Sequence, residues 1–449
     1  MTQTAPRVLV ANRGEIAVRI IRAAHTLGWE AVAIHSDADA GSRWAALADE
    51  AVGLGGSQAK DSYLDIDKVL DAARSTGCQY VHPGYGFLAE RAEFARRVTE
   101  AGMAFVGPTA ENIETMGDKA VARRTAERAG VPVVPGSEVL NDPAEAADVA
   151  HDLGFPVLVK AAAGGGGRGI RMVQEEAGLV GAVEAAQAEA AAAFGDGSVY
   201  LEKAILRPRH VEVQVLADSH GNAVHLFERD CSVQRRRQKL IEESPAPGLS
   251  PRVREEMLDA AVRLAREVGY QGAGTAEFLV DGEEFYFIEV NSRIQVEHPV
   301  TEMVTGVDLV AEQLRIAAGE PLSVTQEEIE TTGAAIEFRI NAEDPDQDFF
   351  PSPGELTRFD PPGGPGIRVD TGFVTGDQIV PYYDSMLAKV IVHGRDRDEA
   401  LNRARQALTE LAVEGITTTR GMHLALVDRR EFRQAEVYTT WFEEAHPAG

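Results

Sequence analysis

The chain has 449 residues, 44% of them hydrophobic, and its 44 basic and 71 acidic residues give a formal net charge of −27. This charge disfavours nucleic acid and anionic membrane surfaces as partners, and no apolar window approaches the roughly 18 residues of a membrane helix. Two cysteines, Cys78 and Cys231, are too few for a disulfide framework. We therefore expect a cytoplasmic globular protein of several structural units that share one active site.

Short apolar strands alternate with helical patterns over the first hundred residues. Strands are predicted at 8–11, 31–35 and 80–81, and helices from about residue 15 and at 65–75. This order predicts an open parallel sheet with helices on both faces. The first strand-to-helix turn, Ala11 to Glu15, contains no GxGxxG, so a dinucleotide-binding site is not favoured.

A glycine run, Gly164 to Gly167, separates two predicted strands at 156–160 and 170–173. A P-loop would instead continue through Lys and Ser or Thr into a helix. Bare N–H groups in such a loop can approach phosphate oxygens, and Lys160 would then point at the phosphates. Taken alone, the run is explained equally well as an exposed flexible loop.

Polar residues recur at every second position after Ile288. If the segment is extended, one face carries Glu289, Asn291, Arg293, Gln295 and Glu297. With a three-residue turn to the preceding strand, Glu277 would lie opposite Glu289. Two carboxylates so close repel unless a cation lies between them, so they predict a Mg²⁺ or Mn²⁺ site shared with nucleotide phosphates. A solvated edge strand is the alternative.

The densest positive patch is the segment 234–239, Gln-Arg-Arg-Arg-Gln-Lys. A solvated surface run or an interface would explain it. We favour an anion-binding wall, in which Arg293 and Lys239 hold a planar oxyanion that Glu297 deprotonates. Together the patterns predict an enzyme that uses ATP to activate a small oxyanion such as bicarbonate.

Short motifs in a fixed order support a more specific interpretation. They are ANRGEIA from Ala11, HPGYGFL from His82, GDK from Gly117, the glycine loop, PRHVE from Pro208, EVNSRIQVEHP from Glu289 and RINAE from Arg339. From about Arg7 to Glu443 the sequence resembles biotin carboxylase, the ATP-grasp component of acetyl-CoA, propionyl-CoA and pyruvate carboxylases. The strings depart from the usual family pattern at Ala163, Arg237 and Ser292, and none of these changes removes a catalytic group.

The resemblance implies an α/β and α+β chain with three domains. These are a Rossmann-like N-terminal domain (1–118), an ATP-grasp domain (119–332) with a mobile lid at about 132–203, and a mostly antiparallel β C-terminal domain (333–449). It also implies a homodimer that meets a biotin carboxyl carrier protein and carboxyltransferase subunits. No lysine lies between two methionines, so biotin is expected on that separate carrier.

The resemblance also implies a role for each matching position. The ATP-binding residues would be Lys119, Lys160, Gly166, Gly167, Glu202, Lys203, Ala204, Ile205, His210, Gln234, Arg237, Glu277 and Glu289. The metal ligands would be Glu277, Glu289 and Asn291. The bicarbonate pocket would contain Lys239, Arg293, Gln295, Val296 and Glu297, and the biotin site Tyr85 and Arg339. The catalytic residues would be Lys239, Arg293, Glu297 and Arg339.

In the implied reaction Glu297 is the base that deprotonates bicarbonate, ATP converts it to carboxyphosphate, and biotin is then carboxylated. Acetyl-CoA is the favoured final acceptor, with pyruvate or another acceptor as the alternative. A different ATP-grasp ligase would have no need of Tyr85 and Arg339 in these settings. A non-catalytic relative would be expected to have lost Glu297 or Lys239, and both are present.

Overall fold

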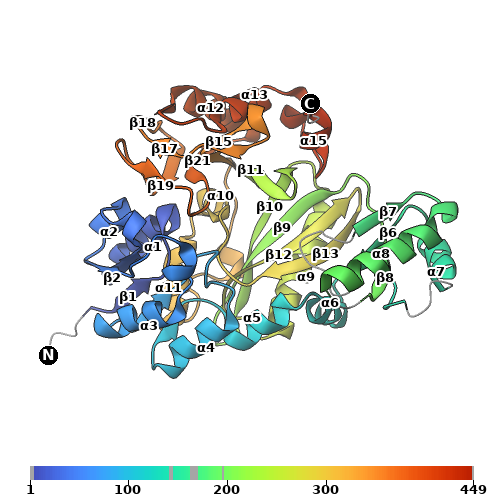
Figure 1. Cartoon of the computed structure of the whole chain (residues 1–449), viewed down its shortest axis with the longest axis horizontal. Coiled ribbons are helices and arrows are strands. Elements are labelled where there is room, and N and C mark those ends of the chain that lie inside the picture. The colour runs from blue at the N-terminus through green and yellow to red at the C-terminus, as the bar shows by residue number, and fades with distance from the viewer. Residues whose placement is uncertain (1–4, 141–144, 162–169, 195–196, 447–449) are drawn as a thin grey trace. The chain divides into compact units, whose positions relative to one another are not determined.

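A computed structural model describes residues 5–140, 145–161, 170–194 and 197–446 (Figure 1). The chain forms two compact units. The first contains Met1–Val131, Arg209–Phe285 and Glu289–Gly449, and the second contains Pro132–Pro208 and Tyr286–Ile288. Both α/β and antiparallel β arrangements occur in the first unit, as the predicted fold class requires. Among the described residues every helix is too short or too polar to span a lipid bilayer.

The N-terminal part of the first unit is a five-stranded parallel sheet in the order β3-β2-β1-β4-β5. Its strands are β1 Arg7–Val10, β2 Glu30–His35, β3 Glu50–Gly53, β4 Tyr80–His82 and β5 Ala104–Phe105. Its helices are α1 Gly14–Thr26, α2 Arg43–Leu47, α3 Ile66–Ser75, α4 Ala92–Glu100, α5 Ala110–Gly117 and α6 Lys119–Arg128. Val8, Leu9 and Val10 are all fully buried, as a strand covered on both faces requires. The predicted parallel sheet is confirmed.

An eight-stranded sheet has the order β13-β12-β9-β10-β11-β14-β21-β19, and all of it except Tyr286–Ile288 of β13 belongs to the first unit. The strands are β9 Arg209–Ala217, β10 Ala223–Arg235, β11 Gln238–Ser244, β12 Gly272–Asp281, β13 Glu284–Asn291, β14 Ala334–Asn341, β19 Ile367–Thr371 and β21 Met386–Gly394. From β12 to β19 each strand is antiparallel to its neighbour. β11 pairs with β14, so strands from both sides of the predicted boundary at 332 and 333 share one sheet. That boundary stays a prediction.

Helices and short strands complete the first unit. The helices are α9 Pro251–Glu267, α10 His298–Thr305, α11 Leu309–Ala317, α12 Arg397–Glu410, α13 Arg420–Val427, α14 Arg430–Arg433 and α15 Trp441–Ala445. The short strands are β15 Glu343–Asp344, β16 Phe350–Pro351, β17 Gly354–Glu355, β18 Arg358–Asp360, β20 Gln378–Ile379 and β22 Ala412–Glu414. Local sequence explains where α9 begins, because the Ser250 side chain accepts a hydrogen bond from the Val253 N–H and Pro251 suits the first turn.

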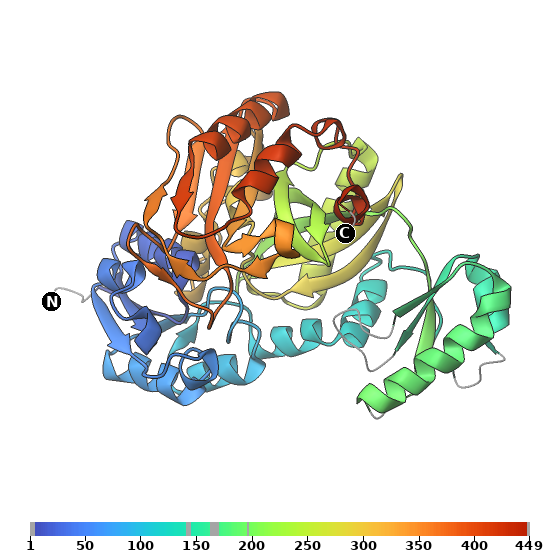
Figure 2. The same ribbon diagram turned by 45° about the horizontal axis from the view of Figure 1, so that its top comes forward.

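The second unit has a three-stranded antiparallel sheet, β7-β6-β8 (Figure 2). Its strands are β6 Val157–Ala161, β7 Ile170–Val173 and β8 Val199–Lys203, and its helices are α7 Glu145–Leu153 and α8 Leu179–Phe194. Buried aliphatic residues of the strands and of both helices form one core. The predicted lid falls within this unit, and its mobility stays a prediction. Ala163, Gly166 and Gly167 lie outside the described residues.

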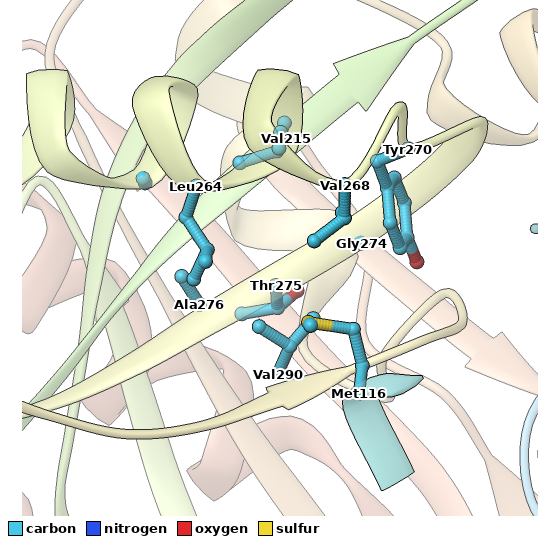
Figure 3. A pocket seen from close by; sticks show the side chains of 11 residues that line it. Met116, Val215, Leu264, Val268, Tyr270, Gly274, Thr275, Ala276 and Val290 are labelled. Atoms are coloured by element: carbon cyan, nitrogen blue, oxygen red, sulfur yellow. The ribbon is translucent and has the colours of Figure 1, made fainter. Parts of the chain in front are cut away.

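A small apolar cavity of about 20 Å³ lies between α9 and the eight-stranded sheet, which is called the large sheet from here on (Figure 3). Leu264 on α9 and Val290 on β13 both line it. Replacing Leu264 with alanine would enlarge this space, so we expect the free energy of unfolding to fall by about 2–5 kcal/mol. Urea unfolding measures the change. Leu64→Ala, at a position that is 42% exposed, is the control, and equal losses in the two variants would contradict the prediction.

Candidate active site

One face of the large sheet carries buried charged side chains from neighbouring strands. Glu212 on β9 lies opposite Glu277 on β12 and opposite Arg229 on β10. All three side chains are buried. Buried charges are stable only when they are paired or hydrogen-bonded, so the contacts among these groups define the site.

Lys239 on β11 joins three carboxylates. Its Nζ lies 2.5 Å from Glu212 Oε2, 2.9 Å from Glu277 Oε1 and 2.6 Å from Glu297 Oε1. Burial would lower the pKa of Lys239, but the surrounding thiol and carboxylates raise it well above its usual value. Lys239 is therefore charged, and it links the predicted metal carboxylate Glu277 to the predicted base Glu297.

Glu297 lies between two cations. Its Oε1 accepts from Lys239, and its Oε2 lies 2.9 Å from Arg339 Nη2. Arg339 Nε also donates to Glu242, 2.6 Å away. Burial would raise the pKa of Glu297, but the nearby cations, Lys239 first among them, lower it well below its usual value. At neutral pH Glu297 is an ionised carboxylate, as a base must be before it accepts a proton.

The polar segment that follows Ile288 is extended only as far as Asn291, where β13 ends. The residues from 292 to 297 form a loop that enters α10, which begins at His298 with Pro299 in its first turn. The prediction of one continuous strand is therefore wrong. The loop nevertheless returns polar groups to the site, because Gln295 Nε2 donates to Glu277 Oε1 over 2.9 Å.

The turn between β12 and β13 contains two residues, Gly282 and Glu283, and Gly282 has a positive φ of 61°. The predicted three-residue turn is wrong. Asn291 still meets Glu277, with its Nδ2 donating to Oε1 over 2.8 Å. Glu289 lies two residues before Asn291 in the same strand, and alternation places both side chains on one face.

The predicted metal carboxylates contact protein cations. Glu289 Oε2 lies 3.0 Å from Lys119 Nζ, and Glu277 Oε2 lies 3.0 Å from His210 Nε2. Burial would lower the pKa of His210, but Glu277 raises it above its usual value. Among the described residues, the acid, imidazole and thiol groups whose ligand atoms lie within 4.8 Å of one another are His210–Glu212–Glu277 and Glu212–Cys231–Glu297. Glu289 is in neither group.

The positive segment 234–239 does not form a continuous anion-binding wall. Arg236 and Arg237 make the turn between β10 and β11, with positive φ values of 47° and 67°. Arg235 and Arg236 pair with Asp348 instead, and the prediction is wrong for them. Arg237, the second residue of this turn, is exposed.

Two residues of the segment do have inward positions. Lys239 reaches the carboxylates described above, and Gln234 is buried, with its Nε2 donating to the Cys231 carbonyl over 3.3 Å. Both lie on strands rather than in the turn. The strand alternation, not the charge of the segment, therefore decides which members face the site.

The other predicted anion and biotin residues also lie in the first unit. Arg293 Nε is 3.0 Å from Glu90, and its Nη2 donates to Asn291 Oδ1 over 3.0 Å. The Val296 carbonyl accepts from the ammonium of Lys389. The Tyr85 hydroxyl donates to the carboxylate of Glu15.

Of the predicted nucleotide residues in the second unit, those that the structure describes lie on β6, on β8 and just after β8. Lys160 pairs with Glu202 on the neighbouring strand. The Lys203 N–H donates to the Pro135 carbonyl, and the Ala204 N–H donates to the Pro156 carbonyl. Ala204 is buried, and Ile205 is partly exposed.

Sequence reasoning missed the buried groups that support the site, above all Arg229. Its five N–H donors all have acceptors, namely Glu212, Gln214, Thr275, Gln295 and Thr301, at 2.6–3.2 Å. The alternation of polar and apolar residues does indicate that Glu212 and Gln214 share one strand face. Arg229 is a single arginine within a strand, and no local pattern distinguishes it from an exposed one.

Two further buried acids, Glu242 on β11 and Glu337 on β14, lie directly opposite each other. Among the described residues neither oxygen of Glu337 has a hydrogen-bond partner. Burial raises the pKa of Glu242 to about 7 despite Arg339, and it raises the pKa of Glu337 well above its usual value despite Lys389. The folded protein therefore holds protons that the unfolded chain loses near pH 4.5.

Because unfolding releases these protons, Glu242 and Glu337 make the folded state less stable as the pH rises above 4.5. The variant Glu337→Gln has no such proton, so its stability relative to the parent should increase between pH 5 and pH 8. Urea unfolding at both pH values tests this. Exposed Glu284→Gln is the control, and an identical Glu337→Gln effect at both values would contradict the expectation.

Comparison with known proteins agrees with this arrangement. Three family models match the chain: "Biotin carboxylase, N-terminal domain" at residues 4–113, "Carbamoyl-phosphate synthase L chain, ATP binding domain" at 118–325 and "Biotin carboxylase C-terminal domain" at 337–444. Biotin carboxylase 1 of Bacillus subtilis is 53% identical over 97% of this chain and 98% of its own length. A pyruvate carboxylase subunit of Methanothermobacter thermautotrophicus is 50% identical over 98% of this chain and 89% of its own.

A solved structure extends the likeness to three dimensions. The biotin carboxylase domain dimer of Hydrogenobacter thermophilus 2-oxoglutarate carboxylase, in complex with MgADP, ADP and bicarbonate, has a TM-score of 0.90 and 49% identity. The match covers 99% of this chain and 98% of that one. The parallel sheet, the ATP-binding family model and full-length relatives of this kind lead to one assignment. This chain belongs to the biotin carboxylase family and is an ATP-dependent ligase.

Proposed function

We propose that this chain uses ATP and a divalent ion, Mg²⁺ or Mn²⁺, to carboxylate biotin held on a separate carrier protein, with bicarbonate as the carbon source. The observation that carries this proposal is the buried carboxylate of Glu297 between the cations of Lys239 and Arg339. Bicarbonate is a stable anion and a poor electrophile. It needs phosphoryl transfer from ATP, to form carboxyphosphate, before its carbon can react.

In this proposal bicarbonate binds among Lys239, Arg293, Gln295, Val296 and Glu297. As its oxygens take over donors of Lys239, Glu297 loses part of its ion pairing, and the proton affinity of Glu297 rises. The carboxylate can then accept the bicarbonate proton while the anion attacks the γ-phosphoryl group. The ion pairs at 2.6 and 2.9 Å support this role because they keep Glu297 ionised until substrate arrives.

We assign the divalent ion to Glu277, Glu289 and Asn291. Carboxylate and amide oxygens suit Mg²⁺, and both carboxylates already contact positive groups, at 3.0 Å for Lys119 and 2.9 Å for Lys239. The chemistry of the donors therefore fits a cation. When bound, the ion would neutralise charge on the phosphate groups of ATP.

We assign ATP to the residues that the family resemblance implies. They are Lys119, Lys160, Gly166, Gly167, Glu202, Lys203, Ala204, Ile205, His210, Gln234, Arg237, Glu277 and Glu289. Tyr85 and Arg339 are assigned to the biotin ring system, where the Arg339 guanidinium would stabilise negative charge.

The proposed setting is an acyl-CoA carboxylase, with acetyl-CoA as the final acceptor. The relatives include proteins named for pyruvate and for 2-oxoglutarate. The choice of acetyl-CoA as the final carboxyl acceptor is therefore a separate proposal from biotin carboxylation itself. A carrier protein and carboxyltransferase subunits are the proposed partners, and a homodimer is supported by the dimeric Hydrogenobacter domain. Two free, buried cysteines are compatible with a reducing cytoplasm.

A coupled assay of ADP release tests the reaction. We expect release to require bicarbonate and to be stimulated by free biotin. Release with bicarbonate and ammonia, unaffected by biotin, would instead indicate a carbamoyl-phosphate type of ligase, which the middle family model leaves open. The native complex, supplied with labelled bicarbonate and each candidate acceptor in turn, identifies the acceptor by where the label appears.

A further inference from the structure

Lys389 on β21 is a fully buried lysine outside every predicted site. It lies opposite Arg339 on β14 and opposite Asp370 on β19, so these side chains share one face of the large sheet. Burying an ammonium group is costly unless it is paired and hydrogen-bonded. The partners of the Lys389 ammonium group therefore indicate the structural role of its charge.

Lys389 Nζ has two close partners. It donates to the Val296 carbonyl over 2.6 Å and lies 3.1 Å from Glu15 Oε1 on α1. Burial would lower the pKa of Lys389, but Glu15, Glu337 and Asp370 raise it above its usual value. The group is thus a cation that holds a backbone carbonyl, with Glu15 as its direct counter-charge.

The carbonyl that Lys389 holds lies in the loop that carries the proposed base. After Asn291 the chain leaves the sheet, so strand pairing no longer fixes its position. Gln295 is fixed by its carbonyl contact with His298 Nδ1 at 2.7 Å. Lys389 fixes the backbone carbonyl of the next residue, Val296, and Glu297 directly follows Val296 in the chain.

We propose that Lys389 is a positioning residue, which holds the backbone at Val296 and thereby places the Glu297 carboxylate and the bicarbonate pocket. The inference rests on the proposed function, because that proposal supplies the roles of Val296 and Glu297. A purely structural role is the competing explanation, in which Lys389 only neutralises the buried Glu15. The two explanations differ in what happens when both charges are removed together.

The experiment compares Lys389→Met, the double variant with Glu15→Gln and Lys389→Met, and the parent. The single variant leaves Glu15 buried without its direct cation and is expected to lose stability. The double variant removes that unpaired charge and keeps the side-chain volumes similar, so it is the variant for kinetics. Lys60→Met, at an exposed lysine, is the matched control.

We expect the double variant to raise the KM for bicarbonate about tenfold or more, because one charge-assisted hydrogen bond is lost. Its KM for ATP should stay within about twofold of the parent value, because the hydrogen bond and ion pair of Lys389 that the described residues show go to Val296 and Glu15, and neither is a proposed ATP residue. Biotin-independent, bicarbonate-stimulated ATP hydrolysis gives the same KM without the biotin site.

A double variant that folds and keeps the parent KM for bicarbonate would overturn the positioning role and leave the proposed function intact. Equal rises in the KM values for bicarbonate and ATP would also overturn it, because they would indicate a general disturbance. A parent protein without bicarbonate-dependent ADP release would overturn the proposed function itself, and the positioning role with it. Circular dichroism and urea unfolding establish that each compared variant is folded.

Discussion

Replacement of Glu297 by glutamine is expected to lower kcat for bicarbonate-dependent ADP release by about 10²–10⁴-fold, the usual contribution of a general base. Glutamine preserves the size of the side chain but only one acceptor oxygen, so its amide NH2 faces one of the two cations. Lys239 keeps its contacts with Glu212 and Glu277, and Arg339 keeps its contact with Glu242. Glutamine cannot accept the proton of bicarbonate at neutral pH. The low pKa of Glu297 means that the parent carboxylate is ionised throughout the neutral range.

The measurement is steady-state ADP release at saturating ATP and biotin, with bicarbonate varied. Glu284→Gln changes an exposed carboxylate at the start of β13 and should match the parent. The urea midpoint of each variant shows whether a loss of activity reflects unfolding. Turnover of the Glu297→Gln protein within about twofold of the parent would remove Glu297 from its role as base.

Replacement of Arg229 by methionine is expected to lower the free energy of unfolding by about 3–5 kcal/mol, the usual cost of breaking a buried ion pair. The substitution removes the cation 2.6 Å from Glu212 and leaves four uncharged acceptors without their donor. Methionine fills much of the vacated volume, so a cavity accounts for little of the loss.

Urea unfolding at pH 7 measures this effect, with Arg124→Met as the control at an exposed helical arginine. Arg229→Lys should also be destabilised, because three donors on a flexible stem cannot reproduce five donors in a planar fork. Equal stability of the Arg229→Met and Arg124→Met proteins would show that the five hydrogen bonds contribute nothing net. We expect the Arg229→Met protein to bind bicarbonate poorly as well, because Arg229 also holds Gln295.

Secondary structure follows closely from local patterns where apolar spacing is regular. The strand predicted at 170–173 is observed with the same bounds. The polar alternation after Ile288 is misleading, because a strand and a loop can both carry alternate polar residues. Gln295 reaches the site from the loop by a turn into α10, which periodicity cannot describe.

The candidate site is recognisable from its motifs, but its electrostatic partners are not. Residues such as Glu277, Lys239 and Glu297 stand out from their neighbours in the chain, and the fold brings them together around one ammonium group. The charged segment 234–239 is the opposite case. The composition of this segment shows that it is positively charged. It does not show that Arg235 and Arg236, at a two-residue hairpin turn, pair with Asp348.

Chain-local information is thus enough for the parallel N-terminal sheet, the family resemblance and the element types where apolar spacing is regular, because propensity, periodicity and short motifs act over a few residues. Burial and pairing of charge depend on the fold. Glu242 and Glu337 are far apart in sequence and directly opposite in space, and Lys389 meets Glu15 from the other end of the chain. Such contacts arise when strands from distant segments join one sheet, and the low-dielectric interior that they create gives these charges their energies.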